Sequence, residues 1–217
     1  KSDPENNPHA MTLCVVERGM EGFERGRNLD KMGMKAQDTA ELFFNNVIIP
    51  KENVLGEVGR GFFYLMQGLA EERLIAAVGS IASARRAFNL TREFVMERKV
   101  FGKPLSYMQN TQFKMAEMDT EIEIVEVFID HLVAEHNEDR LTANMAAKAK
   151  LQSTEIEWKM LDLGVQLHGG AGYMKEYPIC NMFTDARINR ILAGSSEIMK
   201  LIISRDIFSE SYSSNLD

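Results

Sequence analysis

A stripe of apolar residues between Met115 and Leu132 constrains the fold of this chain more than any other feature. Its members are Met115, Met118, Ile122, Val125, Ile129 and Leu132, which follow one another in steps of 3, 4, 3, 4 and 3. This spacing places all of these side chains on one face of an α-helix, in the seam pattern of an antiparallel bundle. The sequence therefore predicts a long amphipathic helix that packs against other helices.

Most of the chain after Gly59 has the same helical character. Residues 61–99 contain almost no helix breakers, and cations followed by Gly102 and Pro104 mark their end. Further helices are expected over residues 141–167, 181–192 and 196–208. Long helices joined by short loops are typical of an up-down helix bundle.

The first 50 or so residues have β character instead. A short β-rich run covers residues 11–16, and a second strand region, residues 40–44 and 47–49, ends at Pro50. Two or three strands do not make a stable sheet alone. We therefore expect the end of a larger β-domain, and, because the chain starts with Lys1 instead of Met, a fragment.

Composition excludes several classes of function. Of the 217 residues, 45% are apolar and 26% charged, the balance of a globular protein. The net charge of −7 does not favour nucleic-acid binding, and no stretch approaches the roughly 20 apolar residues that span a bilayer. Two cysteines, Cys14 and Cys180, cannot form a disulfide framework, which favours a reducing compartment.

The residue types for common catalytic centres are largely missing. None of the four histidines forms the Glu-x-x-His pair of a di-metal bundle, so no metal site is predicted. Residues 168–173 are glycine-rich, but they follow a helix, whereas a dinucleotide fingerprint follows a strand. Taken alone, that segment is best interpreted as a helix cap and loop.

Glu72 is the most informative carboxylate. On a helix it has Leu69, Ile75 and Ala76 three or four residues away. A carboxylate on such a stripe is either paired, for example with Arg73 or Arg85, or held at a raised pKa. The residues alone favour the paired, structural interpretation.

Five ordered groups of segments resemble the C-terminal portion of the acyl-CoA dehydrogenases. They are residues 29–34 with 38–42; 47–50 with 53–56 and 59–62; 98–105; 166–173; and 185–187 with 194–199. The resemblance implies a mainly α fold, an up-down four-helix bundle over residues 57–217. It implies that residues 1–56 are the last strands of an incomplete middle β-domain.

The resemblance also implies a reaction. Family members are flavoproteins that oxidise an acyl-CoA thioester to the trans-2-enoyl-CoA: a carboxylate removes the α-proton, and the β-hydrogen leaves as hydride to FAD. The expected partners are acyl-CoA, electron-transfer flavoprotein as electron acceptor, and further copies in a homodimer or homotetramer. The expected location is the bacterial cytoplasm or the mitochondrial matrix. Two alternatives stay open, an acyl-CoA oxidase and a non-catalytic bundle that acts as an oligomerisation scaffold.

At one position this chain differs from the common pattern of the family, and that difference indicates which residue is the base. Many members carry the catalytic glutamate directly before the Gly of a Gly-Thr/Ser-x-Glu motif, a position that is Ala193 here. Long-chain and isovaleryl members place it on the first bundle helix, in a segment similar to residues 69–74, where it matches Glu72. The resemblance therefore implies that Glu72 is the base, with Glu71 as the fallback.

The remaining site residues are also carried over by resemblance, and several of their family counterparts reach the FAD of a neighbouring subunit. Those expected at the substrate are Arg73 and Gly194. Those expected at FAD are Arg98, Phe101, Gln109, Gln166, Leu167, His168, Gly169, Gly170, Ser195, Ser196 and Glu197. Without the resemblance, Arg98 is equally a cation that caps a helix.

Overall fold

The structure, a computed structural model, describes residues 5, 7 and 9–209. The chain divides into two compact units, Lys1–Leu69 and Ala70–Asp217, and we describe each by itself. The division falls inside helix α1 (Gly61–Glu97), later than the predicted domain boundary after residue 56. That boundary stays a prediction, because compactness alone does not define a domain.

The first unit contains two short antiparallel strand pairs. Strand β1 (Leu13–Cys14) pairs with β4 (Val54–Leu55), and β2 (Phe23–Asn28) pairs with β3 (Ala40–Phe44). A 3-10 turn, η1 (Lys51–Asn53), precedes β4.

The expected strands of this unit need three corrections. The run at residues 11–16 yields only the two residues of β1, and β2 was not expected. The strand expected at residues 47–49 is wrong, because Asn46 takes a left-handed conformation with φ 51° and pairing stops at Phe44.

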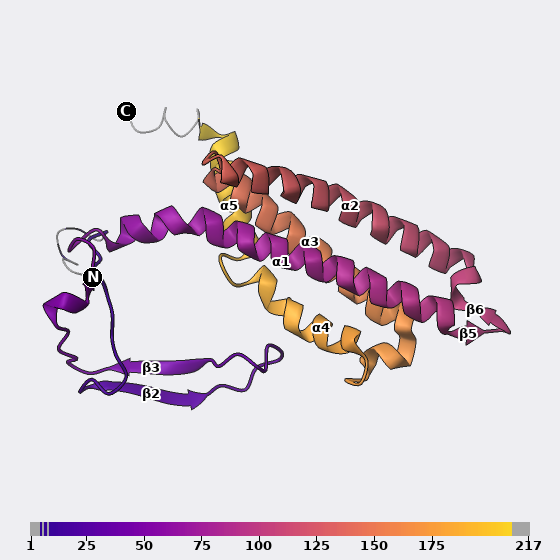
Figure 1. Ribbon diagram of the computed structural model, residues 1–217, viewed down its shortest axis with the longest axis horizontal. Helices are drawn as coiled ribbons and strands as arrows, with labels where there is room; N and C mark the ends of the chain where they lie inside the picture. The colour runs from indigo at the N-terminus through magenta and orange to yellow at the C-terminus, as the bar shows by residue number, and fades with distance from the viewer. Residues whose placement is uncertain (1–4, 6, 8, 210–217) are drawn as a thin grey trace. The chain divides into compact units, whose positions relative to one another are not determined.

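The second unit is helical, and in it the long helices lie side by side with successive reversals of direction (Figure 1). Its helices are the later part of α1, then α2 (Gln109–Asn137), α3 (Ala143–His168), α4 (Pro178–Ala186) and α5 (Ser196–Ile207). The short connecting elements are β5 (Lys99–Val100), β6 (Lys103–Pro104), η2 (Leu105–Tyr107), η3 (Gly169–Tyr173) and η4 (Arg187–Arg190). No helix among the residues described is long and apolar enough to cross a bilayer.

One predicted helix is misplaced. The helix expected at residues 181–192 begins earlier, at Pro178, and gives way after Ala186 to the 3-10 turn η4. Proline favours the first position of a helix, because its fixed φ suits the helix and its missing N–H would have no partner there.

The predicted seam forms the centre of the bundle. Met118, Ile122, Val125, Ile129 and Leu132 are buried, and Met115 packs against them. Residues of α1 and α3 complete this core: Leu74, Ala77, Ile81, Ala84, Phe88, Ala149 and Met160. The mainly α fold class is therefore confirmed.

Gly164 marks the closest approach of α3 to its neighbours. A Cβ at this position would lie 2.9 Å from Cδ1 of Ile179 on α4 and 3.0 Å from Oγ1 of Thr91 on α1. A second core cluster of Ala87, Leu161, Ile179 and Ala186 surrounds this contact. Only glycine allows the three helices to meet at this spacing.

Candidate active site

A cavity of about 390 Å³ lies at the C-terminal end of α3. Its walls come from the last turn of α1, the β5 region, the end of α3 and the start of η3. Six of the residues expected at FAD line it: Arg98, Gln166, Leu167, His168, Gly169 and Gly170. The other lining residues are Phe94, Val100, Leu105, Ala171 and Tyr177.

His168 is the buried polar group of this cavity. Its Nδ1 lies 2.7 Å from the carbonyl oxygen of Gly164, and because a carbonyl only accepts, Nδ1 carries the proton. Its ring stacks on Phe94, and the edge of Tyr177 closes the pair. Burial lowers the pKa of His168, partly opposed by the Gly164 carbonyl. The imidazole is thus held neutral, with Nε2 as the acceptor.

The glycines of this cavity expose backbone. Gly169 caps α3 with φ 59° and ψ −138°. A Cβ at Gly169 or Gly170 would meet no atom within 4 Å, so this backbone is open to a ligand. Arg98 and Gln166 are both exposed, which leaves a guanidinium and an amide available beside it.

A second cluster joins the two residues expected at the substrate, Arg73 and Gly194. Arg73 is only 8% exposed, and its Nε has no hydrogen-bond partner among the described residues. Lys150 of α3 is fully buried, and its Nζ donates to the carbonyl oxygen of Gly194 over 2.7 Å. Burial lowers the pKa of both cations; at Lys150 the charge of Glu155 opposes this shift and the charge of Arg73 adds to it. The two positive groups therefore lie close together in a poorly solvated place.

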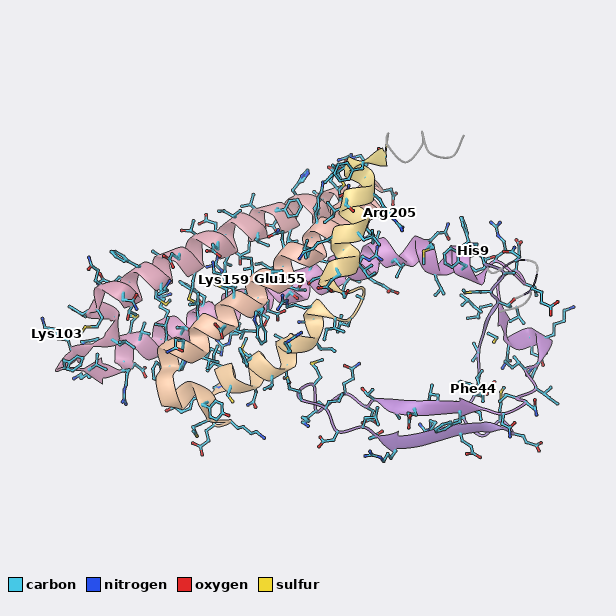
Figure 2. All side chains as sticks on the ribbon, turned by 180° about the vertical axis from the view of Figure 1, so that it is seen from behind. His9, Phe44, Lys103, Glu155, Lys159 and Arg205 are labelled. Carbon is cyan, nitrogen blue, oxygen red and sulfur yellow. The ribbon has the colours of Figure 1, made fainter. Side chains whose placement is uncertain are left out.

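The start of α5 belongs to the same cluster. Ser195 caps the helix, its hydroxyl oxygen accepting from the Ile198 N–H. Glu155 of α3, which is labelled in Figure 2, accepts at Oε1 from the Ser196 hydroxyl (2.8 Å) and from Nε of Arg190 (2.9 Å). The backbone N–H of Glu197 and the Ser195 hydroxyl hold the pKa of the Glu197 carboxyl below its usual value. Ser195, Ser196 and Glu197 are thus brought together, although they lie outside the cavity lined by His168.

Glu72 does not lie on the buried face of α1. It is exposed, as is Ile75, whereas Arg73 and Leu74 are buried. The expected burial of Glu72 against an apolar stripe is therefore wrong for the residues described. The paired alternative is not seen as an ion pair with any described cation: Arg85 binds Asp119 and Glu126, and Arg73 feels the charge of Glu72 without forming an ion pair with it.

Comparison with known proteins identifies the family. Residues 59–208 match the family model described as acyl-CoA dehydrogenase, C-terminal domain. The chain belongs to the acyl-CoA dehydrogenase family. It spans about half the length of the curated relatives it matches.

Three relatives show the degree of similarity. The mouse mitochondrial long-chain specific acyl-CoA dehydrogenase is 46% identical over 94% of this chain and 47% of its own length. The mitochondrial isovaleryl-CoA dehydrogenase of Solanum tuberosum is 35% identical over 97% of this chain and 51% of its own. The crystal structure of an acyl-CoA dehydrogenase from Geobacillus kaustophilus superposes with a TM-score of 0.93 at 44% identity, over 95% of this chain and 55% of that one.

Two residues carried over from the acyl-CoA dehydrogenases lie apart from both clusters. Phe101 is 97% exposed at the turn between β5 and β6, where its φ is 51°. Gln109 is the exposed first residue of α2. Within this chain, neither lines the cavity that holds Arg98.

Three polar residues of α3 were not expected from the sequence: Lys150 and Glu157, which are buried, and Glu155, which is half-buried. Asn189 of η4 donates to Oε2 of Glu157 over 2.8 Å. Burial raises the pKa of the Glu157 carboxyl, more than Asn189 and the nearby hydroxyls of Ser83 and Ser80 lower it. A signal was present in the sequence. Lys150 has Ala146, Ala147, Ser153 and Thr154 three or four residues away, which marks a charged residue on a face of small, packed residues.

Proposed function

We propose that this chain is the C-terminal part of an FAD-dependent acyl-CoA dehydrogenase that converts an acyl-CoA thioester into the trans-2-enoyl-CoA. The observation that carries the proposal is the pair of positions Glu72 and Ala193. Ala193 cannot accept a proton, whereas Glu72 offers an exposed carboxylate with no ion pair among the described residues. Membership of the family supplies the reaction class.

Glu72 is the proposed base that removes the α-proton of the acyl chain. A carboxylate without an ion pair keeps its lone pairs available for proton transfer. The neighbouring guanidinium of Arg73 is buried and has an unpartnered Nε. We assign Arg73 and Gly194 to the thioester end of the substrate, where they would orient the α-carbon toward the base.

The cavity beside His168 fits the pyrophosphate of FAD. A guanidinium binds phosphate through paired hydrogen bonds, and open glycine backbone allows close approach. Arg98, Gln166, Leu167 and the 168–170 turn would hold the cofactor there, with Phe101, Gln109 and the Ser195–Glu197 segment as further contacts by resemblance. When bound, FAD supplies the hydride acceptor.

The identities to relatives favour one substrate class. The chain is 46% identical to a long-chain enzyme but 35% identical to an isovaleryl enzyme. We therefore propose that the substrate carries a long-chain acyl group and not a short branched one. By resemblance to the family, the proposed electron acceptor is electron-transfer flavoprotein.

Self-association is the remaining part of the proposal. Several apolar side chains of the bundle are exposed, including Ile75 at 63% and Ile124 and Val127 at 65% each. Apolar surface of this kind favours a homodimer or homotetramer. Light scattering of the full-length protein tests this, and a clean monomer at tens of micromolar would contradict it.

The decisive experiment compares Glu72→Gln with Glu71→Gln in the full-length protein. Glutamine keeps the size of the side chain but cannot take the proton, so FAD should still bind while anaerobic flavin bleaching by a long-chain acyl-CoA slows about 10²–10⁴-fold. Glu71→Gln should bleach at the parent rate. A fast Glu72→Gln variant would refute the assignment, and rapid reoxidation of the reduced parent by air would indicate an oxidase.

A further inference from the structure

One helix holds the whole segment that leads into α5. Three side chains of α3 reach three different points of it: Glu157 accepts from Asn189, Glu155 from Arg190 and Ser196, and Lys150 donates to Gly194. The segment from residue 189 to residue 196 is thus tied to α3 at its beginning, in its middle and at its end. Two of the residues expected at the substrate or cofactor, Gly194 and Ser196, are direct partners.

Lys150 is the least expected of these three residues. It is fully buried, yet no carboxylate among the described residues forms an ion pair with it. An ammonium has three N–H donors, and within the described part of the chain the side chain of Lys150 makes one hydrogen bond, to Gly194. The charges of Glu155 and Glu197 favour the ammonium, but burial outweighs them and the pKa of Lys150 is lowered, so this buried charge is costly. A packed methionine would fill this space at lower cost, so the bond to Gly194 is the feature that requires lysine.

The carbonyl that Lys150 binds lies in a strained turn. Ala193 has φ 53° and Gly194 has φ 100°, so two successive residues adopt the left-handed region. For alanine this conformation costs roughly 1–2 kcal/mol and persists only when the surroundings fix it. A Cβ at Gly194 would also lie 2.5 Å from Cε of Met199, which shows how closely α5 follows the turn.

We propose that Lys150 is a positioning residue whose ammonium fixes the Gly194 carbonyl and so holds the Ala193–Gly194 turn in its left-handed form. The position of this turn sets where Ser195 caps α5 and where the Gly194 carbonyl meets Lys150. Glu155 and Glu157 hold the flanking points, and Lys150 fixes the strained one. The consequence for catalysis rests on the proposed function, but the consequence for the turn does not.

Lys150→Met in the full-length protein removes the hydrogen bond to the Gly194 carbonyl while keeping the packing of the side chain. Methionine fills a similar volume but donates no hydrogen bond. Lys148→Met, at an exposed position two residues earlier on α3, is the matched control. We expect amide hydrogen exchange in residues 193–199 to rise about tenfold in Lys150→Met, the worth of one hydrogen bond to a strained turn, and not in the control.

The pattern of exchange decides the outcome. Faster exchange confined to residues 193–199 supports the proposal, whereas unchanged exchange there, or an equal rise throughout α1–α3, overturns it. Lys150→Gln retains an N–H donor, and its exchange should lie between those of the parent and the methionine variant. If Lys150→Met does not fold, Lys150→Gln alone is judged by the same pattern.

A kinetic measurement links the turn to the reaction. In the FAD-loaded protein, Lys150→Met should lower the limiting rate of flavin reduction about tenfold while the Kd for acyl-CoA changes much less, because orientation and not attachment is lost. An equal weakening of both would overturn the positioning role. Failure of the proposed function is separate, because then the parent itself would not be reduced by acyl-CoA, whatever the exchange pattern.

Discussion

The imidazole of His168 stacks on the ring of Phe94 with 4.2 Å between the ring centroids. The two residues come from the ends of α3 and α1, so this contact brings the helix ends together. Arg98 follows Phe94 by one turn, and its backbone N–H donates to the Phe94 carbonyl over 2.9 Å. The stack therefore places the Arg98 guanidinium at the same cavity as Gln166 and the glycine turn.

The buried imidazole predicts a pH-dependent stability. Because burial lowers the pKa of His168, the unfolded chain binds its proton first as the pH falls. The stabilisation is complete above the unfolded pKa of about 6.5 and is lost as the pH falls from there through the folded pKa. Chemical denaturation at pH 8, 6.5 and 5 measures the unfolding free energy of the parent and of His168→Asn, which keeps an N–H donor for the Gly164 carbonyl. As the pH falls, the unfolding free energy of the parent should decline more than that of the variant.

NMR of the imidazole provides the check. The ring signal of His168 should titrate below pH 6.5. A titration at or above that value, or a parallel pH dependence in parent and His168→Asn, would contradict the prediction.

Glu157 predicts the opposite pH dependence. Burial raises the pKa of its carboxyl, so as the pH falls the folded chain binds the proton before the unfolded chain does. The resulting stabilisation is complete below the unfolded pKa and is lost as the pH rises through the folded pKa. Glu157→Gln removes this loss and keeps an oxygen for Asn189. Its Tm should exceed that of the parent at pH 7.5, and the gain should shrink toward pH 4. The exposed Glu93→Gln is the control, because an equal gain there would indicate a general effect of the net charge of −7.

Arg98 predicts a loss of cofactor affinity. Hydrogen bonds to a charged group contribute about 1.5–3 kcal/mol, so Arg98→Gln in the full-length protein should weaken FAD binding about 10–100-fold. Fluorescence titration of the apoprotein with FAD measures this. Arg92→Gln, at an exposed position in the preceding helix α1, should bind FAD like the parent, and equal affinities of the two variants would remove Arg98 from the site.

Truncating Met118 should leave a cavity in the core of the bundle and lower its stability. Met118 is fully buried, and truncation of a buried methionine leaves a cavity, so Met118→Ala should lower the unfolding free energy by about 2–5 kcal/mol. Met96→Ala, where the parent side chain is 56% exposed, should change it by no more than about 0.5 kcal/mol. Urea denaturation measures both, and comparable losses would show that α2 is not packed as described.

The helices were largely predictable because their signals are local. The seam from Met115 to Leu132 repeats every three or four residues, and the start of α5 at Ser196 follows from its cap. The strands were less predictable because their pairing is not local. β2 contains the charged residues Glu24, Arg25 and Arg27, and only its pairing with β3 reveals it.

The candidate site was predictable only in part. Resemblance located Arg98 and Gln166, which prove to line one cavity although they are far apart in sequence. It did not indicate Lys150 or Glu157, because their importance depends on which segment crosses α3. The exposure of Glu72 was likewise hidden, since apolar neighbours three or four residues away do not reveal which side of a helix is covered.

Gly164 has two roles in the bundle. Its carbonyl oxygen orients His168, and its lack of a side chain sets the spacing between α3, α1 and α4. One position thus carries two constraints, one steric and one electrostatic. A substitution that pushed the helices apart would also turn or release the imidazole, even though the new side chain pointed away from the cavity. The cavity at the end of α3 is for this reason sensitive to the spacing of the helices one turn deeper in the bundle, at a residue that does not line it.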